Sequence, residues 1–377
     1  MNNTVIPNFI GIFVSIFLAL LLFTKKGKNR SDNILGIWLL TIGFHLWLYY
    51  MMLSDGIYQF PILLGSHLIF PFLHGPLLVF YIISLTKPHQ FTKKMVTLHA
   101  ILPIVVCLIY FPFFSMTADE KIRVFQNQGQ GFEHIISVVN ILLSLSGLFY
   151  LFYNFKLVND HKRNIMAQFS NQEKINLNWL RILVYMMAFI WILIIIVQSD
   201  FLIFSTTTVY LICIGYFGIK QVGIFSNTST NIIANIPIQD PNSNIIPEQI
   251  KKYAKSGLNE ETAVEIHEKL NQVMIDEKLF KESELTLDEL SKALDVQPNY
   301  ISQVINEREG VNFYDYVNKL RVEEFKKISV LPENQNFTLI SLAYECGFNS
   351  KSAFNRIFKK MTDLSPSEYT KSQLPTK

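Results

Sequence analysis

Four side chains that donate hydrogen bonds are grouped near the C-terminus of the sequence. They share one face of a helix expected to follow Ser350, and they are Lys351, Ser352, Asn355 and Arg356. Such groups can bond phosphate oxygens, and amide and guanidinium groups can also bond base edges in the major groove of DNA. Arg356 is the strongest candidate, because a guanidinium can bond guanine with two donors. The alternative for Arg356 is an ion pair with Glu345.

The helix that carries these donors belongs to a longer pattern at residues 338–360. Apolar residues keep helical spacing up to Gly347, and a second apolar stripe follows Ser350. Gly347 stands where a helix must stop and turn sharply. Residues 338–360 are therefore expected to form a helix-turn-helix unit.

A second copy of this pattern is expected at residues 286–308. Thr286 and Glu289 form a capping box at the start of its first helix, and Pro298 suits the first position of its second helix. The polar residues expected to face outward and to contact DNA are Asn299, Ser302 and Gln303.

The two units are separated by a stretch with helical spacing at residues 312–329. A helix of this length spans roughly 27 Å at about 1.5 Å per residue. With its flanking residues it could place two reading helices in adjacent major grooves, which lie about 34 Å apart.

These stretches together resemble the DNA-binding domain of the AraC family, in which a central helix joins two helix-turn-helix units. The residues that carry the resemblance are LTLDELSKAL, NYISQVINE, NFYDYVNKLR, AYECGFNSKSAFNRIFKK and LSPSEY. The resemblance implies sequence-specific binding to double-stranded DNA. Asp363 departs from the pattern where many members have glycine, and Gln303 stands where an arginine is common.

The first 220 residues have a different character, because long apolar runs dominate them. Seven segments approach the roughly 20 residues that a spanning helix needs, and they are 5–24, 33–53, 62–85, 95–115, 135–155, 182–198 and 201–219. The sequence thus predicts an all-α protein. Residues 1–220 would form a seven-helix transmembrane domain, 221–257 a flexible linker and 258–377 the AraC-type domain.

The orientation of the membrane domain follows from its loops. Lysine and arginine residues gather after the first, third and fifth segments, whereas the alternate loops hold only Lys121 and Arg123. The positive-inside rule then places the N-terminus outside and the C-terminal domain in the cytoplasm. The expected location is the inner membrane, with several spans, and the architecture resembles membrane-bound AraC-type regulators with a seven-helix sensor.

Histidines at membrane depth suggest a site for a signal molecule. His67 and His74 are seven residues apart and are expected to share one face of a helix kinked by proline. One interpretation is a ligand pocket lined by both histidines and by the aromatic residues Trp47, Tyr50 and Tyr81. The other is that both histidines are neutral and structural.

The longest cytoplasmic loop between spans runs over residues 156–178 and is rich in asparagine, glutamine and charged residues. It is a candidate contact between the membrane and soluble parts. A solvated connector is the alternative.

Charge and cysteine content restrict the remaining function classes. Residues 281–377 hold 13 Lys/Arg against 14 Asp/Glu, so any DNA affinity must come from local placement. Three cysteines without metal-ligand spacing indicate no metal site, and no nucleophile-base pair or phosphate loop suggests an enzyme or a cofactor.

The sequence therefore predicts a membrane-anchored transcription regulator. Its partners would be double-stranded DNA, the lipid bilayer and an unidentified signal ligand, and a homodimer is one of the oligomeric states left open. The alternatives are a transporter, or a membrane adaptor, with a regulatory helix-turn-helix domain.

Overall fold

The computed structural model describes residues 5–171, 178–220 and 258–373. Every named element in these ranges is helical, and one isolated antiparallel β-bridge joins Phe169 to Thr286. The expected all-α class is confirmed. The described residues form two compact units, 5–161 with 178–220 and 162–171 with 258–373. The predicted linker, 221–257, lies outside the described residues.

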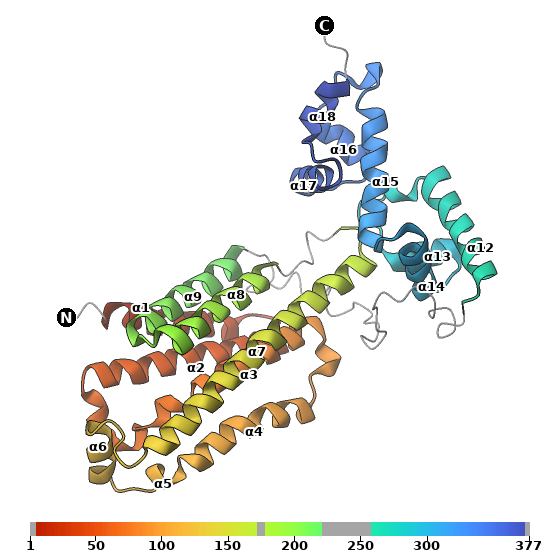
Figure 1. Cartoon of the computed structure of the whole chain (residues 1–377). Coiled ribbons are helices and arrows are strands. Elements are labelled where there is room, and N and C mark those ends of the chain that lie inside the picture. Colours follow the sequence, from red (N-terminus) through yellow and green to blue (C-terminus); the bar gives the residue numbers. More distant parts are fainter. Residues whose placement is uncertain (1–4, 172–177, 221–257, 374–377) are drawn as a thin grey trace. The chain divides into compact units, whose positions relative to one another are not determined.

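The first unit is built from long apolar helices (Figure 1). Its main helices are α1 (Val5–Thr24), α2 (Arg30–Leu53), α3 (Pro71–Thr86), α4 (Lys93–Ile109), α5 (Phe111–Phe114), α6 (Ala118–Gln126), α7 (Glu133–Gln168), α8 (Asn178–Ile192) and α9 (Asp200–Lys220). Trp38, Leu78 and Leu211 are among the residues of its largest core. The unit boundary falls inside α7, after His161, so the last turns of this helix belong to the second unit.

Among the described residues, five helices are long and apolar enough to cross a membrane, and a bent pair, Pro61–Leu68 with Pro71–Thr86, could form a sixth span. The remaining expected segment, 95–115, is divided into α4, with 17 residues, and the short α5. Pro112 lacks the N–H that a continuous helix needs at this position, which explains why α4 ends nearby. Seven spans therefore stay a prediction.

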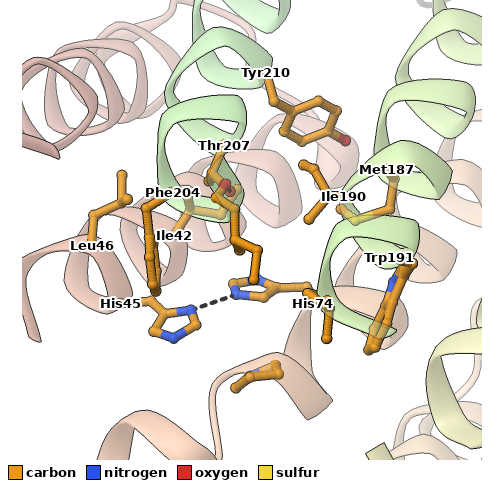
Figure 2. Close-up of a pocket in the computed structure, with 13 residues that line it drawn as sticks. Ile42, His45, Leu46, His74, Met187, Ile190, Trp191, Phe204, Thr207 and Tyr210 are labelled. Atoms are coloured by element: carbon orange, nitrogen blue, oxygen red, sulfur yellow. Dashed lines mark hydrogen bonds between the residues drawn. The ribbon is translucent and has the colours of Figure 1, made fainter. Parts of the chain in front are cut away.

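The bend in the third segment separates two histidines that were expected on one helix face. His67 lies in the short helix η3 (Ser66–Leu68), whereas His74 lies in α3 beyond a bend of 59°. The ring of His74 instead meets that of His45 on α2, with 3.1 Å between Nε2 and Nδ1 (Figure 2). The expectation that His67 and His74 share one helix face is thus wrong, because the helix is broken between them.

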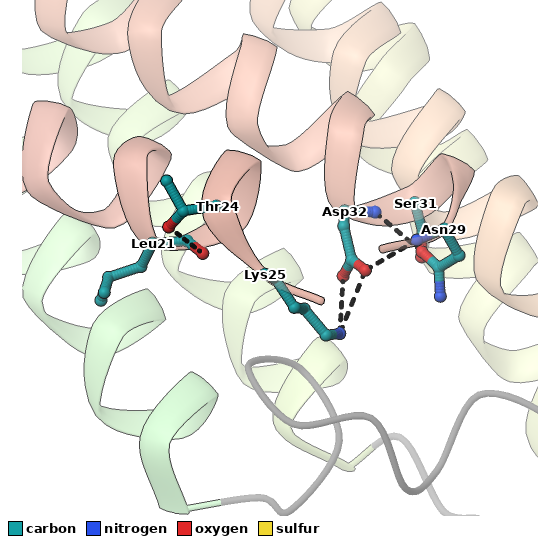
Figure 3. A network of polar contacts seen from close by, with 6 residues as sticks. All are labelled: Leu21, Thr24, Lys25, Asn29, Ser31 and Asp32. Atoms are coloured by element: carbon teal, nitrogen blue, oxygen red, sulfur yellow. Dashed lines mark hydrogen bonds and ion pairs between the residues drawn. The ribbon is translucent and has the colours of Figure 1, made fainter. Parts of the chain in front are cut away.

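The turn between α1 and α2 holds a buried ion pair (Figure 3). Lys25 Nζ lies 3.0 Å from Asp32 Oδ2, and the two side chains are 4% and 6% exposed. Asp32 also accepts from the backbone N–H of Asn29, whose side chain caps the start of α2. The carboxylate is therefore fixed by a cation and by the helix start together.

The second unit contains two pairs of helices around a central one. Its helices are α12 (Glu260–Asn271), α13 (Leu287–Leu294), α14 (Pro298–Val304), α15 (Phe313–Ile328), α16 (Leu339–Glu345), α17 (Lys351–Thr362) and α18 (Pro366–Gln373). We call α13 with α14 the first helix pair and α16 with α17 the second helix pair. Thr286 and Glu289 form the capping box that the sequence predicts at the start of α13.

The central helix α15 contributes to two separate cores. Phe313 and Val317 pack with the first helix pair, whereas Val322 and Phe325 pack with the second. The two helix pairs therefore have separate cores that share the central helix.

The turn of the second helix pair depends on glycine. Gly347 has φ +92°, and a Cβ at this position would lie 2.7 Å from the carbonyl oxygen of Lys281 and 2.8 Å from that of Phe280. No side chain can be accommodated there without moving backbone. Asp363, where the resemblance leads one to expect glycine, also adopts a left-handed conformation, with φ +60°, and ends α17.

We predict that Lys25→Ala destabilises the first unit by about 3 kcal/mol or more, because it leaves the buried Asp32 carboxylate without its cation. Lys26→Ala removes the same charge from an exposed side chain and is the matched control. Unfolding of the full-length protein in detergent by increasing SDS measures the difference. Equal midpoints for the two variants would contradict a stabilising role of the ion pair.

We predict that Gly347→Ala destabilises the second unit more than Gly310→Ala does. Both positions have positive φ, so each variant carries a backbone strain of about 1 kcal/mol. Only at Gly347 does the added methyl group meet backbone, since a Cβ at Gly310 would have no atom within 4 Å. Urea-dependent proteolysis of the C-terminal part in the full-length protein measures both. Similar losses would show that the close approach at Gly347 is unimportant.

Candidate nucleic-acid interface

In the second helix pair the start of α17 is held in place by core packing and by a helix cap. Phe354 and Phe358 of α17 are almost fully buried and pack against Phe325 of α15, with ring centroids 4.7 and 5.4 Å away. Ser350 caps the helix, because its Oγ accepts from the backbone N–H of Ala353 at 3.1 Å. The first turns of α17 are thus fixed both by packing and by a cap.

The four donors expected on this helix all lie on its exposed side. Lys351, Ser352, Asn355 and Arg356 are exposed, whereas Ala353, Phe354 and Ile357 face the core. The structure therefore brings the four predicted residues together within two turns of one helix.

Arg356 is held by a residue that sequence reasoning did not single out. Its guanidinium hydrogen-bonds with the phenol of Tyr314 on α15, and the pKa of this phenol is raised by burial and lowered in part by Arg356. Among the described residues this partner takes the place of Glu345, the carboxylate considered in the sequence. A neutral partner leaves the positive charge of Arg356 available to a ligand.

The first helix pair has fewer exposed donors. Asn299 on α14 is exposed, whereas Ser302 and Gln303 are half-buried. The Gln303 amide donates to Glu307 at 3.1 Å, and the backbone oxygen of Ser302 accepts from Asn306 at 2.6 Å. The structure places these residues on one helix, but Gln303 already has an intramolecular partner.

The exposed charges of the two helix pairs differ. The second pair carries exposed Lys351, Arg356 and Lys359, while Lys360 lies 2.9 Å from Asp315 of α15. In the first pair Lys292 of α13 is exposed, and Arg308, just after α14, pairs with Glu260 of α12. The second helix pair thus carries more exposed cations than the first.

Arg321 on α15 is a further residue that sequence reasoning missed. Its side chain is 2% exposed, although arginine is among the residues that are rarely buried. The signal was its spacing, because Arg321 follows Val317 and precedes Phe325 by four residues each and so falls within the buried stripe.

The histidines of the first unit line two different cavities. His45 and His74 border an apolar cavity of about 60 Å³ together with Trp191, Phe204 and Tyr210 (Figure 2). His67 borders a larger one of about 240 Å³, whose other lining residues include Tyr110, Phe113, Phe125, Gln128 and Phe132. Three aromatic residues expected in a single pocket, Trp47, Tyr50 and Tyr81, line neither cavity.

Metal ligands do not gather at either place. Within the part of the chain that the structure describes, no group of three or more His, Cys, Asp or Glu side chains could hold a metal ion.

Known proteins resemble the C-terminal part of this chain. Residues 290–372 match a family described as a helix-turn-helix domain. The uncharacterized HTH-type transcriptional regulator YijO of Escherichia coli is 34% identical over 98 residues, which are 25% of this chain and 34% of that protein. YtdP of Bacillus subtilis, with the same description, is 34% identical over 88 residues, which are 23% of this chain and 11% of that protein.

Solved structures also match part of the chain. The C-terminal domain of AraT, a response regulator from Geobacillus stearothermophilus, is 24% identical with a TM-score of 0.25, and the match covers 30% of this chain and 88% of that one. The chain spans about a third of the length of YijO and about a tenth of that of YtdP. The family match shows that residues 290–372 of this chain contain a helix-turn-helix domain.

Proposed function

We propose that this protein is a membrane-anchored transcription regulator in which residues 258–377 bind specific sites on double-stranded DNA. The observation that supports it most is the set of four exposed donors at the start of α17. An amide, a guanidinium and an ammonium group project from a capped helix whose opposite side is buried. This is the arrangement in which a recognition helix presents its first turns to base edges and phosphates.

Both helix pairs take part as helix-turn-helix units, at residues 286–308 and 338–360. In the second unit Arg356 and Asn355 read base edges, while Lys351 and Ser352 contact phosphates. In the first unit Asn299, Ser302 and Gln303 contact DNA, and Gln303 exchanges Glu307 for its DNA partner. The 16 residues of α15, about 24 Å of helix, separate the units so that one chain can occupy two successive major grooves.

The first 220 residues anchor the protein in the inner membrane through seven spans, with the N-terminus outside and the DNA-binding domain in the cytoplasm. The five apolar helices and the bent pair support this arrangement. The basic loops after the first, third and fifth spans set the orientation. Residues 221–257 link the membrane domain to the DNA-binding domain.

The membrane domain senses a signal molecule through its histidine-bordered cavities. The cavity beside His67 is large enough for a small ligand, and its lining combines aromatic rings with the polar side chains of His67 and Gln128. Binding sites for small molecules commonly have this composition, apolar walls with a few polar groups. The apolar cavity beside His74 is the second candidate position.

We predict that Arg356→Ala weakens binding to a specific site by about 1 to 3 kcal/mol and binding to random DNA much less, because the lost contact reads a base. The full-length protein in lipid nanodiscs would first select its site from a random DNA library. The expected site has two half-sites about one helical turn apart. Titration of the selected and random DNA then gives both affinities.

Lys269→Ala is the charge-matched control, since Lys269 is an exposed cation on α12, outside both helix pairs. It should change neither affinity appreciably. If Arg356→Ala instead lowers the two affinities by the same factor, Arg356 contacts phosphate and does not read sequence.

We predict that replacing His67 and His74 by alanine changes the output of a reporter driven by the selected site, without changing protein level or DNA affinity. Each single variant shows which cavity holds the signal, because the two histidines line different ones. His134→Ala, at an exposed position of α7, is the control. Unchanged output in the double variant would leave both histidines with a structural role.

A further inference from the structure

The end of α7 lies in a groove of the second unit. Ser170, two residues past the helix, is 2% exposed, and the groove around it is formed by the start of α13, by α15 and by the segment after the short helix η7 (Leu279–Lys281). We call residues 166–171 the α7 tail and this site the docking groove. These residues lie within the loop at 156–178, for which the sequence allows either a contact between the membrane and soluble parts or a solvated connector.

The α7 tail pairs with backbone of the groove. Phe169 forms an antiparallel β-bridge with Thr286, and the Ser170 N–H donates to the carbonyl oxygen of Leu285 at 3.1 Å. The Ser170 hydroxyl donates to the same oxygen at 2.6 Å. The tail is thus bound through one antiparallel bridge and the hydrogen bonds of Ser170, next to the N-terminal cap of the first helix pair.

Two side chains of α15 complete the docking groove. Asn318 donates to the carbonyl oxygen of Ser170 at 3.2 Å, and Arg321 Nη2 donates to its hydroxyl at 3.2 Å. Arg321 also donates to the carbonyl oxygens of Phe280 and Glu282, at 2.8 and 2.6 Å. The buried guanidinium is therefore surrounded by neutral oxygens, one of which the α7 tail supplies.

The α7 tail also reaches the second helix pair. Met166 packs against the core that contains Phe354 and Phe358. Asn171 borders a small cleft together with Asn349 and Arg356, at the start of α17. A single short segment thus bonds the cap of the first pair and the central helix, packs against the core of the second pair, and borders a cleft beside the start of α17.

We infer that the α7 tail is an intramolecular ligand of the docking groove and that it holds the two helix pairs in the relative orientation needed to bind two half-sites at once. The effect on DNA rests on the proposed function. Since α7 is one helix of 36 residues that starts in the first unit, occupancy of the groove is a direct route by which a change in that unit reaches the DNA-binding unit. A fixed orientation of the two helix pairs matters because their two contacts with DNA reinforce each other only when both can form at the same time.

A disulfide test of the groove needs no DNA. In a full-length chain whose three native cysteines are replaced by alanine, Phe169→Cys with Thr286→Cys should cross-link on mild oxidation in membranes. Paired residues of an antiparallel bridge have Cα atoms about 4.5 to 5.5 Å apart, within the range that a disulfide spans. Phe169→Cys with Lys292→Cys, whose partner is exposed on α13, should not cross-link. Absence of the first cross-link would overturn the proposed docking.

A second test separates docking from its effect on DNA. Ser170→Pro removes both the N–H and the hydroxyl that bond Leu285, whereas Ser170→Ala removes the hydroxyl alone. In the full-length protein in nanodiscs, Ser170→Pro should lower the affinity for DNA with both half-sites about tenfold or more, with Ser170→Ala between it and the unchanged protein. The affinity for DNA that carries only the half-site of α17 should stay the same.

Other results would overturn the inference. A rise in affinity would make the α7 tail an inhibitory contact, and an equal loss on both DNAs would exclude a role in joint binding. If the protein selects no DNA sequence at all, the proposed function fails, while the cross-link still decides whether the docking groove is occupied.

Discussion

The C-terminal part of the molecule depends on α15 serving two cores from different sides. Phe313 and Val317 close the core of the first helix pair, and Val322 and Phe325 close that of the second. Because each core is small, neither helix pair could bury enough apolar surface without the side chains that α15 contributes to it. The same sharing restricts the motion of one pair against the other, since a tilt of α15 changes the packing of both. The orientation of the two candidate reading helices is therefore a property of one helix and its contacts.

Local features of this part could be predicted because each is specified by a few neighbouring residues. Thr286 with Glu289, Ser350 and Gly347 form the caps and the turn that their types and spacing indicate. The exposure of Lys351 and Arg356 follows in the same way, since helical periodicity settles which face is buried. The long apolar helices of the first unit were found from their apolar length, although α7 continues to Gln168, beyond the expected end, because no glycine or proline stops it.

Features that depend on distant residues were not predictable from the pattern. His67 and His74 are separated by a bend whose size periodicity does not give, so one expected pocket became two cavities. Nor does any local signal pair Ser170 with Arg321, which is 151 residues away. A buried arginine within an apolar stripe shows only that an acceptor must exist nearby. Its identity requires the fold.

The charge balance of the C-terminal part explains why orientation should matter more than attraction. With 13 basic and 14 acidic residues between Lys281 and Lys377, the domain has little long-range field to draw in DNA. Ion pairs with Glu260 and Asp315 further neutralise Arg308 and Lys360. In the function we propose, each helix pair would then bind DNA weakly alone, because phosphate neutralisation supplies most non-specific affinity. Joint binding by two weak contacts is strong only when their geometry is fixed, and the hydrogen bonds of Ser170 lie where that geometry is set.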